Sequence, residues 1–334
     1  MPMKAVVIGD GAWGTALALD LLENGHEVVL WGAFPDYLEE MAAKRENTRF
    51  LRGVELPEGL KFEADPVRAV AGASLAVLAT PTQFLGGVLK RFAEAGIPSG
   101  LIAVNVAKGI ETGTLRRISE MVEAEFGSRV RYAVLSGPSH AEEVSRRIPT
   151  LVTAASRDPE AALEVQRAFL NERFRVYTTG DVVGVELGGA LKNVFAIAAG
   201  IIDGMRLGDN PKAALMTRGI SELGRLGEKL GGRRETLSGL AGIGDLIVTC
   251  TSGHSRNRHV GEELGRGKRL AEILADMGMV VAEGVATSES AYRLARRAEV
   301  ETPLVDAVYS VLYQERSVRD VLRELMTRAP KAEF

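Results

Sequence analysis

The segment VVIGDGAWGTALALDLLENG near the start of the chain restricts the fold more than any other part of the sequence. It places Gly9, Gly11 and Gly14 in G-x-G-x-x-G spacing, directly after a β-branched apolar run and at the start of a helical pattern. There the first glycine permits a tight turn, the second lets a pyrophosphate approach the backbone, and the third lets helix pack on strand. The helix N-terminus also offers unpaired N–H groups to an anion. A glycine-rich turn that binds nothing is the alternative, but the flanking patterns favour a dinucleotide-binding unit.

Short apolar runs alternate with amphipathic helical segments through the first half of the chain. Such nearly continuous apolar strands are typical of a parallel sheet that is covered on both faces. After about Gly180 the strand pattern stops, and helices with Ala, Leu and Met stripes follow. We therefore predict an α/β, Rossmann-like doubly wound sheet in residues 1–183 and an all-α domain in residues 184–334. The expected strands are KAVVIG, EVVLW, LAVLA, LIAVNVA, YAVLSG, TLVTAA and FRVYT.

The composition limits the cellular setting and the partners. The formal net charge of −3 gives no general attraction to nucleic acid. The single cysteine, Cys250, cannot form an internal disulfide, and no signal peptide precedes the first strand pattern, so we expect a cytoplasmic protein. The most apolar stretch, VFAIAAGIIDG, is shorter than the roughly 20 residues of a membrane span, so we predict a buried helix and no membrane association. No metal site is expected.

Two loops at the ends of predicted strands carry polar groups. VNVAKGIETG presents Lys108 just after a strand, and LSGPSHAEEV presents Ser136, Gly137, Ser139 and His140 at a strand-to-helix turn. Ligands bind at the carboxyl ends of strands in such sheets, so these loops are candidates for ligand contacts. Taken alone, both loops are also consistent with ordinary solvated turns, and a histidine at a helix N-terminus is usually solvated.

The helical half contains two charged residues in apolar surroundings. Lys192, followed by Asn193, lies within an otherwise small and apolar helix, where an unpaired ammonium would be costly to bury. We expect Lys192 to face a polar cleft, where a lowered pKa would suit proton transfer near neutral pH. Asp245 lies in the run AGIGDLIVTC, shortly before Ser255, Arg256 and Asn257. From the residues alone, Asp245 is either a structural acid or part of a site.

The end of the second predicted strand leaves the choice of cofactor open. An acidic residue there favours NAD, and a nearby arginine accommodates the phosphate of NADP. The sequence has WGAFPD, with neither residue at the expected place, and we expect Asp36 to lie at the start of a helix.

Several long segments, in this order, resemble the NAD(P)-dependent glycerol-3-phosphate dehydrogenases of the bacterial type over nearly the full chain. The resemblance implies the helical domain seen in 6-phosphogluconate dehydrogenase, and reversible hydride transfer between a nicotinamide and the dihydroxyacetone phosphate and sn-glycerol 3-phosphate pair. It also implies a supply of precursor for phospholipid synthesis, and a homodimer. The segments are GDGAWGTALA, VNVAKGIE, LSGPSHAEEV, GVELGGALKNVFAIAAGI, NPKAALMTRGISEL, LSGLAGIGDLIVTCTSGHSRNR and VAEGV.

The same resemblance implies roles for individual residues. Lys192 matches the proton donor and Lys108 a second active-site lysine. Asp245 would lie against Lys192, holding its ammonium in place, or against the substrate hydroxyl. The residues that match substrate contacts are Lys108, Gly137, Ser139, Lys192, Asp245, Ser255, Arg256 and Asn257. Those that match positions around NAD or NADP are Gly9, Gly11, Ala12, Trp13, Gly14, Lys108, Ala141, Arg256, Val281 and Glu283.

Two positions depart from the family pattern. Ala33 stands where members often carry an arginine or histidine, so one contact with an NADP phosphate is missing unless Arg45, Arg49 or Arg52 supplies it. His140 stands where a phenylalanine is usual, which would alter packing against the nicotinamide. Two other functions remain possible in principle: a related oxidoreductase that acts on a β-hydroxyacid, and a dinucleotide sensor without turnover. A sensor would have no use for Lys192 opposite Asp245.

Overall fold

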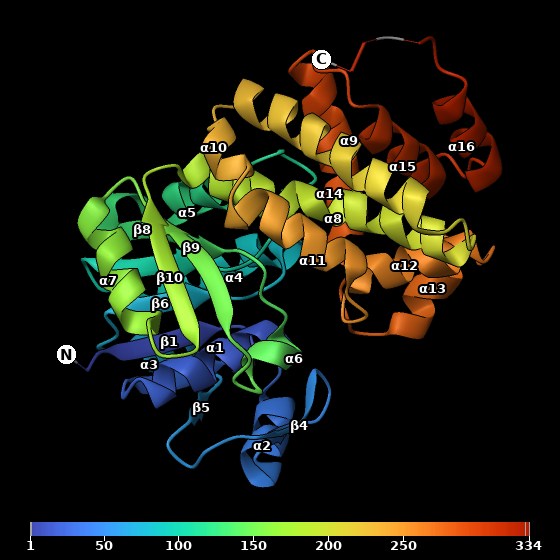
Figure 1. Ribbon diagram of the computed structural model, residues 1–334. Coiled ribbons are helices and arrows are strands. Elements are labelled where there is room, and N and C mark those ends of the chain that lie inside the picture. The colour runs from blue at the N-terminus through green and yellow to red at the C-terminus, as the bar shows by residue number, and fades with distance from the viewer. Residues whose placement is uncertain (1, 331, 334) are drawn as a thin grey trace.

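The computed structural model describes residues 2–330 and 332–333. Within them, an eight-stranded sheet forms the N-terminal part and a bundle of helices forms the C-terminal part (Figure 1), as the sequence predicted. The strand order is β10-β9-β8-β7-β6-β1-β2-β5. The strands are β1 (Lys4–Ile8), β2 (Glu27–Trp31), β5 (Lys61–Glu63), β6 (Leu75–Leu78), β7 (Leu101–Asn105), β8 (Val130–Ser136), β9 (Thr150–Ala155) and β10 (Phe174–Thr179).

Helices cover both faces of the sheet because its central strands are apolar on both sides. In β1, Ala5 and Val7 pack into a core with α1 and α7, whereas Val6 and Ile8 pack into a second core with α3, α4 and α5. A short hairpin, β3 (Glu46–Asn47) with β4 (Leu51–Glu55), follows α2. The helices of this part are α1 (Ala12–Glu23), α2 (Pro35–Lys44), α3 (Pro66–Val70), α4 (Thr82–Ala95), α5 (Ile118–Phe126), α6 (Ala141–Val144) and α7 (Pro159–Phe169).

The sheet differs from the prediction in direction and in number of strands. β9 pairs antiparallel with β8 and parallel with β10, so the sheet is not parallel throughout. An apolar run indicates that a strand is buried, but it does not indicate whether the strand runs parallel or antiparallel to its neighbours. The sequence could therefore not show that β9 is reversed. β5 and the hairpin were missed because KFE and LRGVE contain too few apolar residues to give a strand pattern. Asp36 lies in the first turn of α2, as expected.

Every regular element after β10 in the described residues is helical. The helices are α8 (Val182–Gly204), α9 (Asp209–Lys229), α10 (Arg234–Leu237), a π-helical turn (Leu240–Gly244), α11 (Asp245–Thr251), α12 (Arg256–Gly265), α13 (Leu270–Met277), α14 (Glu283–Arg297), α15 (Pro303–Tyr313) and α16 (Val318–Met326). The division of the chain at residues 183 and 184 stays a prediction.

The central helix of this part, α8, is longer than the sequence suggested. It has 23 residues, and by length and composition alone it could cross a membrane, so the prediction that the apolar stretch is too short was wrong. Glu186, Lys192 and Asn193 interrupt the apolar run in the sequence, but all three are buried in this helix. In its most apolar 18-residue window, 89% of the residues are buried inside the protein. The helix is therefore the core of the bundle, packed against α9, α11, α12 and α14.

Glycines bring α8 and α12 into direct backbone contact. A Cβ at Gly200 would lie 1.9 Å from the carbonyl oxygen of Arg258, and a Cβ at Gly261 would lie 1.9 Å from that of Ile197. Only residues without a side chain permit so close an approach. Because α12 begins at Arg256, this contact fixes the N-terminus of α12 relative to Lys192 on α8.

A single methyl group at this contact is expected to destabilise the protein. Gly261→Ala should lower the free energy of unfolding by about 1–3 kcal/mol, the usual cost of overpacking, because the backbones must separate. Gly224→Ala on α9 is the matched control, since a Cβ there meets nothing within 4 Å. It should leave stability unchanged or raise it by about 0.4–1 kcal/mol. Urea unfolding measures both, and equal stability of the two variants would contradict the close contact.

Candidate active site

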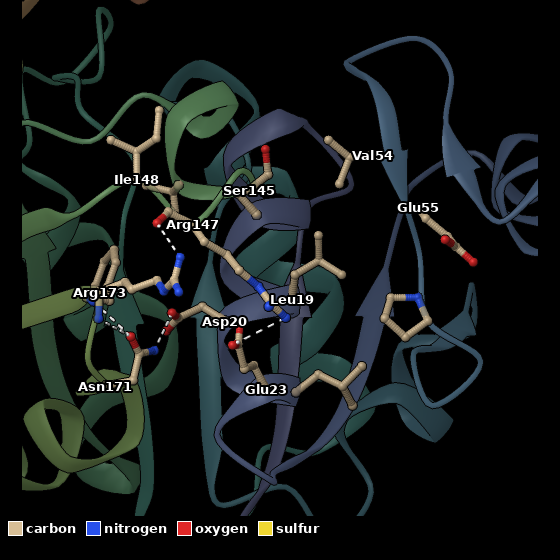
Figure 2. Close-up of a pocket in the computed structure, with 15 residues that line it drawn as sticks. Leu19, Asp20, Glu23, Val54, Glu55, Ser145, Arg147, Ile148, Asn171 and Arg173 are labelled. Atoms are coloured by element: carbon tan, nitrogen blue, oxygen red, sulfur yellow. Dashed lines mark hydrogen bonds and ion pairs between the residues drawn. The ribbon is translucent and has the colours of Figure 1, made fainter.

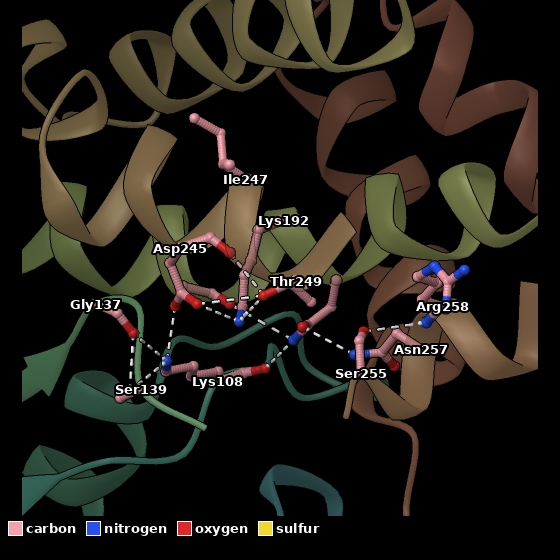
Figure 3. Close-up of polar contacts among 12 residues, drawn as sticks. Lys108, Gly137, Ser139, Lys192, Asp245, Ile247, Thr249, Ser255, Asn257 and Arg258 are labelled. Carbon is pink, nitrogen blue, oxygen red and sulfur yellow. Dashed lines mark hydrogen bonds and ion pairs between the residues drawn. The ribbon is translucent and has the colours of Figure 1, made fainter. Parts of the chain in front are cut away.

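A buried cluster of two lysines and one aspartate lies where the helical part meets the loops of the sheet (Figure 3). Lys192 on α8 donates to Oδ1 of Asp245 at 2.5 Å, and Lys108, after β7, donates to Oδ2 at 2.7 Å. The Asp245 side chain is 1% exposed, that of Lys192 7% and that of Lys108 15%. The structure thus brings together all three residues predicted to be catalytic, with Asp245 between the two ammonium groups.

Thr249 is a fourth member that the sequence did not indicate. Its hydroxyl accepts from Nζ of Lys192 at 2.6 Å and donates to the carbonyl oxygen of Asp245 at 2.6 Å. It lies one turn after Asp245 on α11, so both side chains face α8. The spacing of four residues on one helix was the signal available in the sequence.

Small residues on α8 allow the other elements to approach the cluster. A Cβ at Gly188 would lie 2.6 Å from the carbonyl oxygen of Ala241, in the π-helical turn that leads into Asp245. A Cβ at Gly189 would lie 2.7 Å from Oγ of Ser136 and 3.4 Å from Cγ of Lys108. The glycines that precede Lys192 therefore create the space in which Asp245 and Lys108 reach it.

Burial and charge act in opposite directions on the cluster. Burial lowers the pKa of Lys192 to about 8, and the attraction of Asp245 only partly offsets this effect. For Asp245, burial raises the pKa, but the charges and hydrogen bonds of Lys108 and Lys192 outweigh burial and hold the pKa below its usual range. With both lysines charged and Asp245 ionised, the cluster carries one excess positive charge, which suits an anionic ligand.

The loop after β8 contributes polar groups to the same place. The carbonyl oxygen of Gly137 accepts from Nζ of Lys108 at 2.9 Å, and the Ser139 hydroxyl donates to that oxygen at 2.8 Å. His140 is not solvated as expected: its Nε2 is buried without a hydrogen-bond partner in the described part of the chain. Burial, followed by the charges of Lys192 and Lys108, lowers the pKa of His140. Its ring lies 5.8 Å from that of His254.

The three residues at the start of α12 have different surroundings. Ser255 caps the helix, with its hydroxyl accepting from the backbone N–H of Arg258 at 3.2 Å. Asn257 donates to Oδ1 of Asn193 at 2.9 Å and accepts from the N–H of Gly284 at 2.8 Å. The exposed Arg256 side chain makes no hydrogen bond or ion pair with any described residue. Of the three, Arg256 is therefore the residue whose side chain has no described hydrogen bond or ion pair that a ligand would have to replace.

The glycine-rich loop has the geometry that its spacing predicted. Gly9 has φ of +131°, and a Cβ there would lie 2.7 Å from the backbone of Ala79. A Cβ at Gly14 would lie 2.0 Å from the carbonyl oxygen of Gly9, whereas a Cβ at Gly11 would meet nothing within 4 Å. No described side chain caps α1, and the indole Nε1 of Trp13 is buried without a partner. The open space over Gly11, the uncapped helix and the unpaired donor fit the pyrophosphate of a dinucleotide.

Glu283 connects the helical part to the start of α4. Its Oε1 accepts from the backbone N–H of Thr82 at 2.7 Å, while its Oε2 is buried without a described partner. Burial raises the pKa of Glu283 to about 7. The other predicted cofactor contacts are Ala12 in the first turn of α1, Ala141 at the start of α6, and the half-buried Val281 just before α14.

A cavity of about 360 Å³ lies elsewhere, between α1, β4 and the loops before β9 and β10 (Figure 2). Asp20, Arg147, Asn171 and Arg173 line it, and none of the predicted site residues does. The cavity is therefore separate from the Lys192 cluster. No group of three or more His, Cys, Asp or Glu side chains in the described residues could hold a metal ion.

Comparison with known proteins identifies the family. The model of the NAD-dependent glycerol-3-phosphate dehydrogenase N-terminus matches residues 4–162, and that of the C-terminus matches residues 181–323. The chain belongs to the NAD-dependent glycerol-3-phosphate dehydrogenase family. It is 50% identical over 332 residues to the glycerol-3-phosphate dehydrogenase [NAD(P)+] of Bacillus cytotoxicus, covering 99% of this chain and 97% of that protein. The Geobacter metallireducens glycerol-3-phosphate dehydrogenase [NAD(P)+] is 52% identical, covering 100% of this chain and 99% of that protein.

A solved member of the glycerol-3-phosphate dehydrogenase family has the same fold. The crystal structure of glycerol-3-phosphate dehydrogenase from Coxiella burnetii matches with a TM-score of 0.94 at 38% identity, covering 98% of this chain and 99% of that one. The predicted family and fold class are thus confirmed. The residue roles that the family resemblance implied remain predictions, which the geometry of the site makes testable.

Proposed function

We propose that this protein catalyses the reversible reduction of dihydroxyacetone phosphate to sn-glycerol 3-phosphate with NADH or NADPH, supplying glycerophospholipid synthesis. The observation that carries the proposal is the buried Lys192–Asp245–Lys108 cluster. The start of α12 is tied to it, because Asn257 donates to Asn193, the neighbour of Lys192. A proton donor with its pKa lowered to about 8 suits the reduction of a ketone near neutral pH. The excess positive charge of the cluster suits a phosphorylated substrate.

Each charged group has a task that its position supports. Arg256 binds the substrate phosphate or the pyrophosphate of the nucleotide, through charge-assisted hydrogen bonds. Lys192 donates a proton to the C2 oxygen as that oxygen gains negative charge, and solvent then restores the proton to Lys192. Asp245 holds the Lys192 ammonium in place through the 2.5 Å contact. Lys108, on the other oxygen of Asp245, stabilises the developing charge on the substrate.

A reduced nicotinamide dinucleotide bound here would supply hydride to C2 of the ketone, and the C=O electron pair would move to the oxygen that Lys192 protonates. Residues around Gly9, Gly11, Gly14 and Trp13 would hold the pyrophosphate against the N-terminus of α1. Glu283, the first residue of α14, which accepts from the backbone N–H of Thr82, would lie beside the bound dinucleotide.

The direct test is oxidation of NADH and of NADPH, followed at 340 nm with dihydroxyacetone phosphate as the substrate. Rapid turnover supports the proposal. Turnover only with β-hydroxyacids would favour the related oxidoreductase instead, and nucleotide binding without turnover of any substrate would favour a sensor.

We expect kcat/KM for reduction and kcat/KM for oxidation to change with pH in opposite directions. Reduction requires Lys192 to be protonated, so kcat/KM for the ketone should fall about tenfold per pH unit above about pH 8. Oxidation of glycerol 3-phosphate requires neutral Lys192, so its kcat/KM should rise with pH and level off near the same value. Steady-state kinetics between pH 6 and 10 measure kcat/KM in both directions. If kcat/KM changed with pH in the same direction for both reactions, Lys192 could not be the group that transfers the proton.

We also propose that the protein acts in the cytoplasm as a homodimer, with neither a nucleic acid nor a membrane as its partner. The formal net charge of −3 supports the absence of a nucleic-acid partner. Light scattering of the purified protein tests the oligomeric state.

A further inference from the structure

The end of β2 lacks the acidic side chain that usually recognises the adenosine ribose in NAD-binding folds. Trp31 ends the strand, and Gly32 and Ala33 follow, so neither of the next two residues can bind a hydroxyl group through its side chain. The side chain that recognises the ribose must therefore come from another segment of the chain.

Asp10, in the glycine-rich loop, places its carboxylate at this position. A Cβ built on Gly32 would lie 2.6 Å from Oδ2 of Asp10 and 2.8 Å from its Cγ. The carboxylate thus occupies the space in which a side chain of residue 32 would begin. The glycine at position 32 is what makes room for it.

The backbone of Asp10 is fixed, but one oxygen of its carboxylate has no partner. The carbonyl oxygen of Asp10 accepts from Nδ2 of Asn47 at 2.8 Å, and Asn47 is held in turn by Tyr37 at 2.6 Å. Oδ2 of Asp10 is buried and accepts no hydrogen bond from any described residue. Such an orphaned acceptor is costly unless a ligand supplies a donor. Asp10 as a whole is only partly buried, so part of the residue is open to a ligand that binds over the glycine-rich loop.

We infer that Asp10 recognises the adenosine ribose and selects NAD(H) over NADP(H). The inference rests on the proposed function, because it assumes that a nicotinamide dinucleotide binds over the glycine-rich loop. The ribose of NAD has hydroxyl groups that can donate to a carboxylate. A 2′-phosphate in the same place would put a second anion against Asp10.

The nearby arginines each have other partners. Arg45 donates to the carbonyl oxygen of Leu56 at 2.9 Å, and Arg52 donates to that of Thr48 at 2.6 Å. Arg49 is the arginine whose charge acts on Asp10, but its guanidinium stacks 4.0 Å over the ring of Tyr37 and lies 3.7 Å from Glu40. The carboxylate of Asp10, which lies against Gly32, is the charged group that the structure places directly after β2.

The test is nucleotide binding by calorimetry to the full-length protein, independent of turnover. The wild type should bind NADH at least about tenfold more tightly than NADPH, because hydrogen bonds to a charged group are replaced by repulsion. Asp10→Asn should reduce this preference by about tenfold or more. The control, Asp36→Asn, removes the same charge from an exposed site on neighbouring α2 and should leave the preference unchanged.

A second measurement does not depend on any variant. Wild-type protein should bind adenosine 5′-monophosphate more tightly than adenosine 2′,5′-bisphosphate, which carries the additional phosphate. Equal binding of these two nucleotides, or an unchanged preference in Asp10→Asn, overturns the inference. Failure to reduce dihydroxyacetone phosphate would instead refute the proposed function, and the binding preference could still hold.

Discussion

Replacement of Lys192 by methionine is expected to lower kcat/KM for reduction of dihydroxyacetone phosphate by about 10²- to 10⁴-fold, the usual contribution of a positioned proton donor. Methionine keeps an unbranched side chain of similar length but cannot donate a proton. The substitution also removes the 2.5 Å contact between Lys192 and Asp245, whereas Asp245 keeps its contact with Lys108. Initial rates under subsaturating substrate measure the effect.

Binding of NADH by the Lys192→Met variant should stay close to that of the wild type, since the glycine-rich loop is a separate part of the site. The control is Lys268→Met, which removes a lysine paired with Glu263 in the same helical half. That variant should retain nearly full activity. If Lys192→Met turned over at a rate similar to the control, Lys192 could not be the proton donor.

The parts of the site that the sequence predicted are those fixed by local structure. The glycine spacing predicted the loop before α1 and the helix that follows it. An unpaired lysine in an apolar helix is costly to bury, and that cost indicated that Lys192 faces polar groups. Each of these inferences depends on residues within one or two turns of one another.

The parts that could not be predicted depend on contacts between distant segments. Asp245 is separated by 53 positions from Lys192 and by 137 from Lys108, and no local pattern shows that it bonds to both. Ser255 and Asn257 match ligand contacts of the family, which stay predictions; the sequence did not show that Ser255 also caps α12 or that Asn257 joins Asn193 to Gly284. The sequence alone does not show whether a serine hydroxyl or an asparagine amide bonds to a ligand or to the backbone.

The Asp245→Asn variant is expected to show the largest loss of stability. Asparagine keeps the shape but removes the charge that compensates two buried or partly buried ammonium groups. Breaking a buried ion pair by removal of one partner typically costs about 3–5 kcal/mol, and we expect a loss of this size in the free energy of unfolding at pH 7. Activity should fall as well, since Lys192 would lose its fixed position.

The loss of stability in Asp245→Asn should diminish as the pH rises. Without Asp245, the pKa of Lys192 in the folded state falls further below its value in the unfolded chain. Between these two values the unfolded chain binds more protons, so the stability of the variant rises with pH. Asp306→Asn is the control: it breaks an exposed pair with Arg296 and should cost at most about 1 kcal/mol. Urea unfolding of both variants at pH 7 and pH 9.5 measures the effect. If the loss of stability in Asp245→Asn were the same at both pH values, its cause would be lost packing and not uncompensated charge on Lys192.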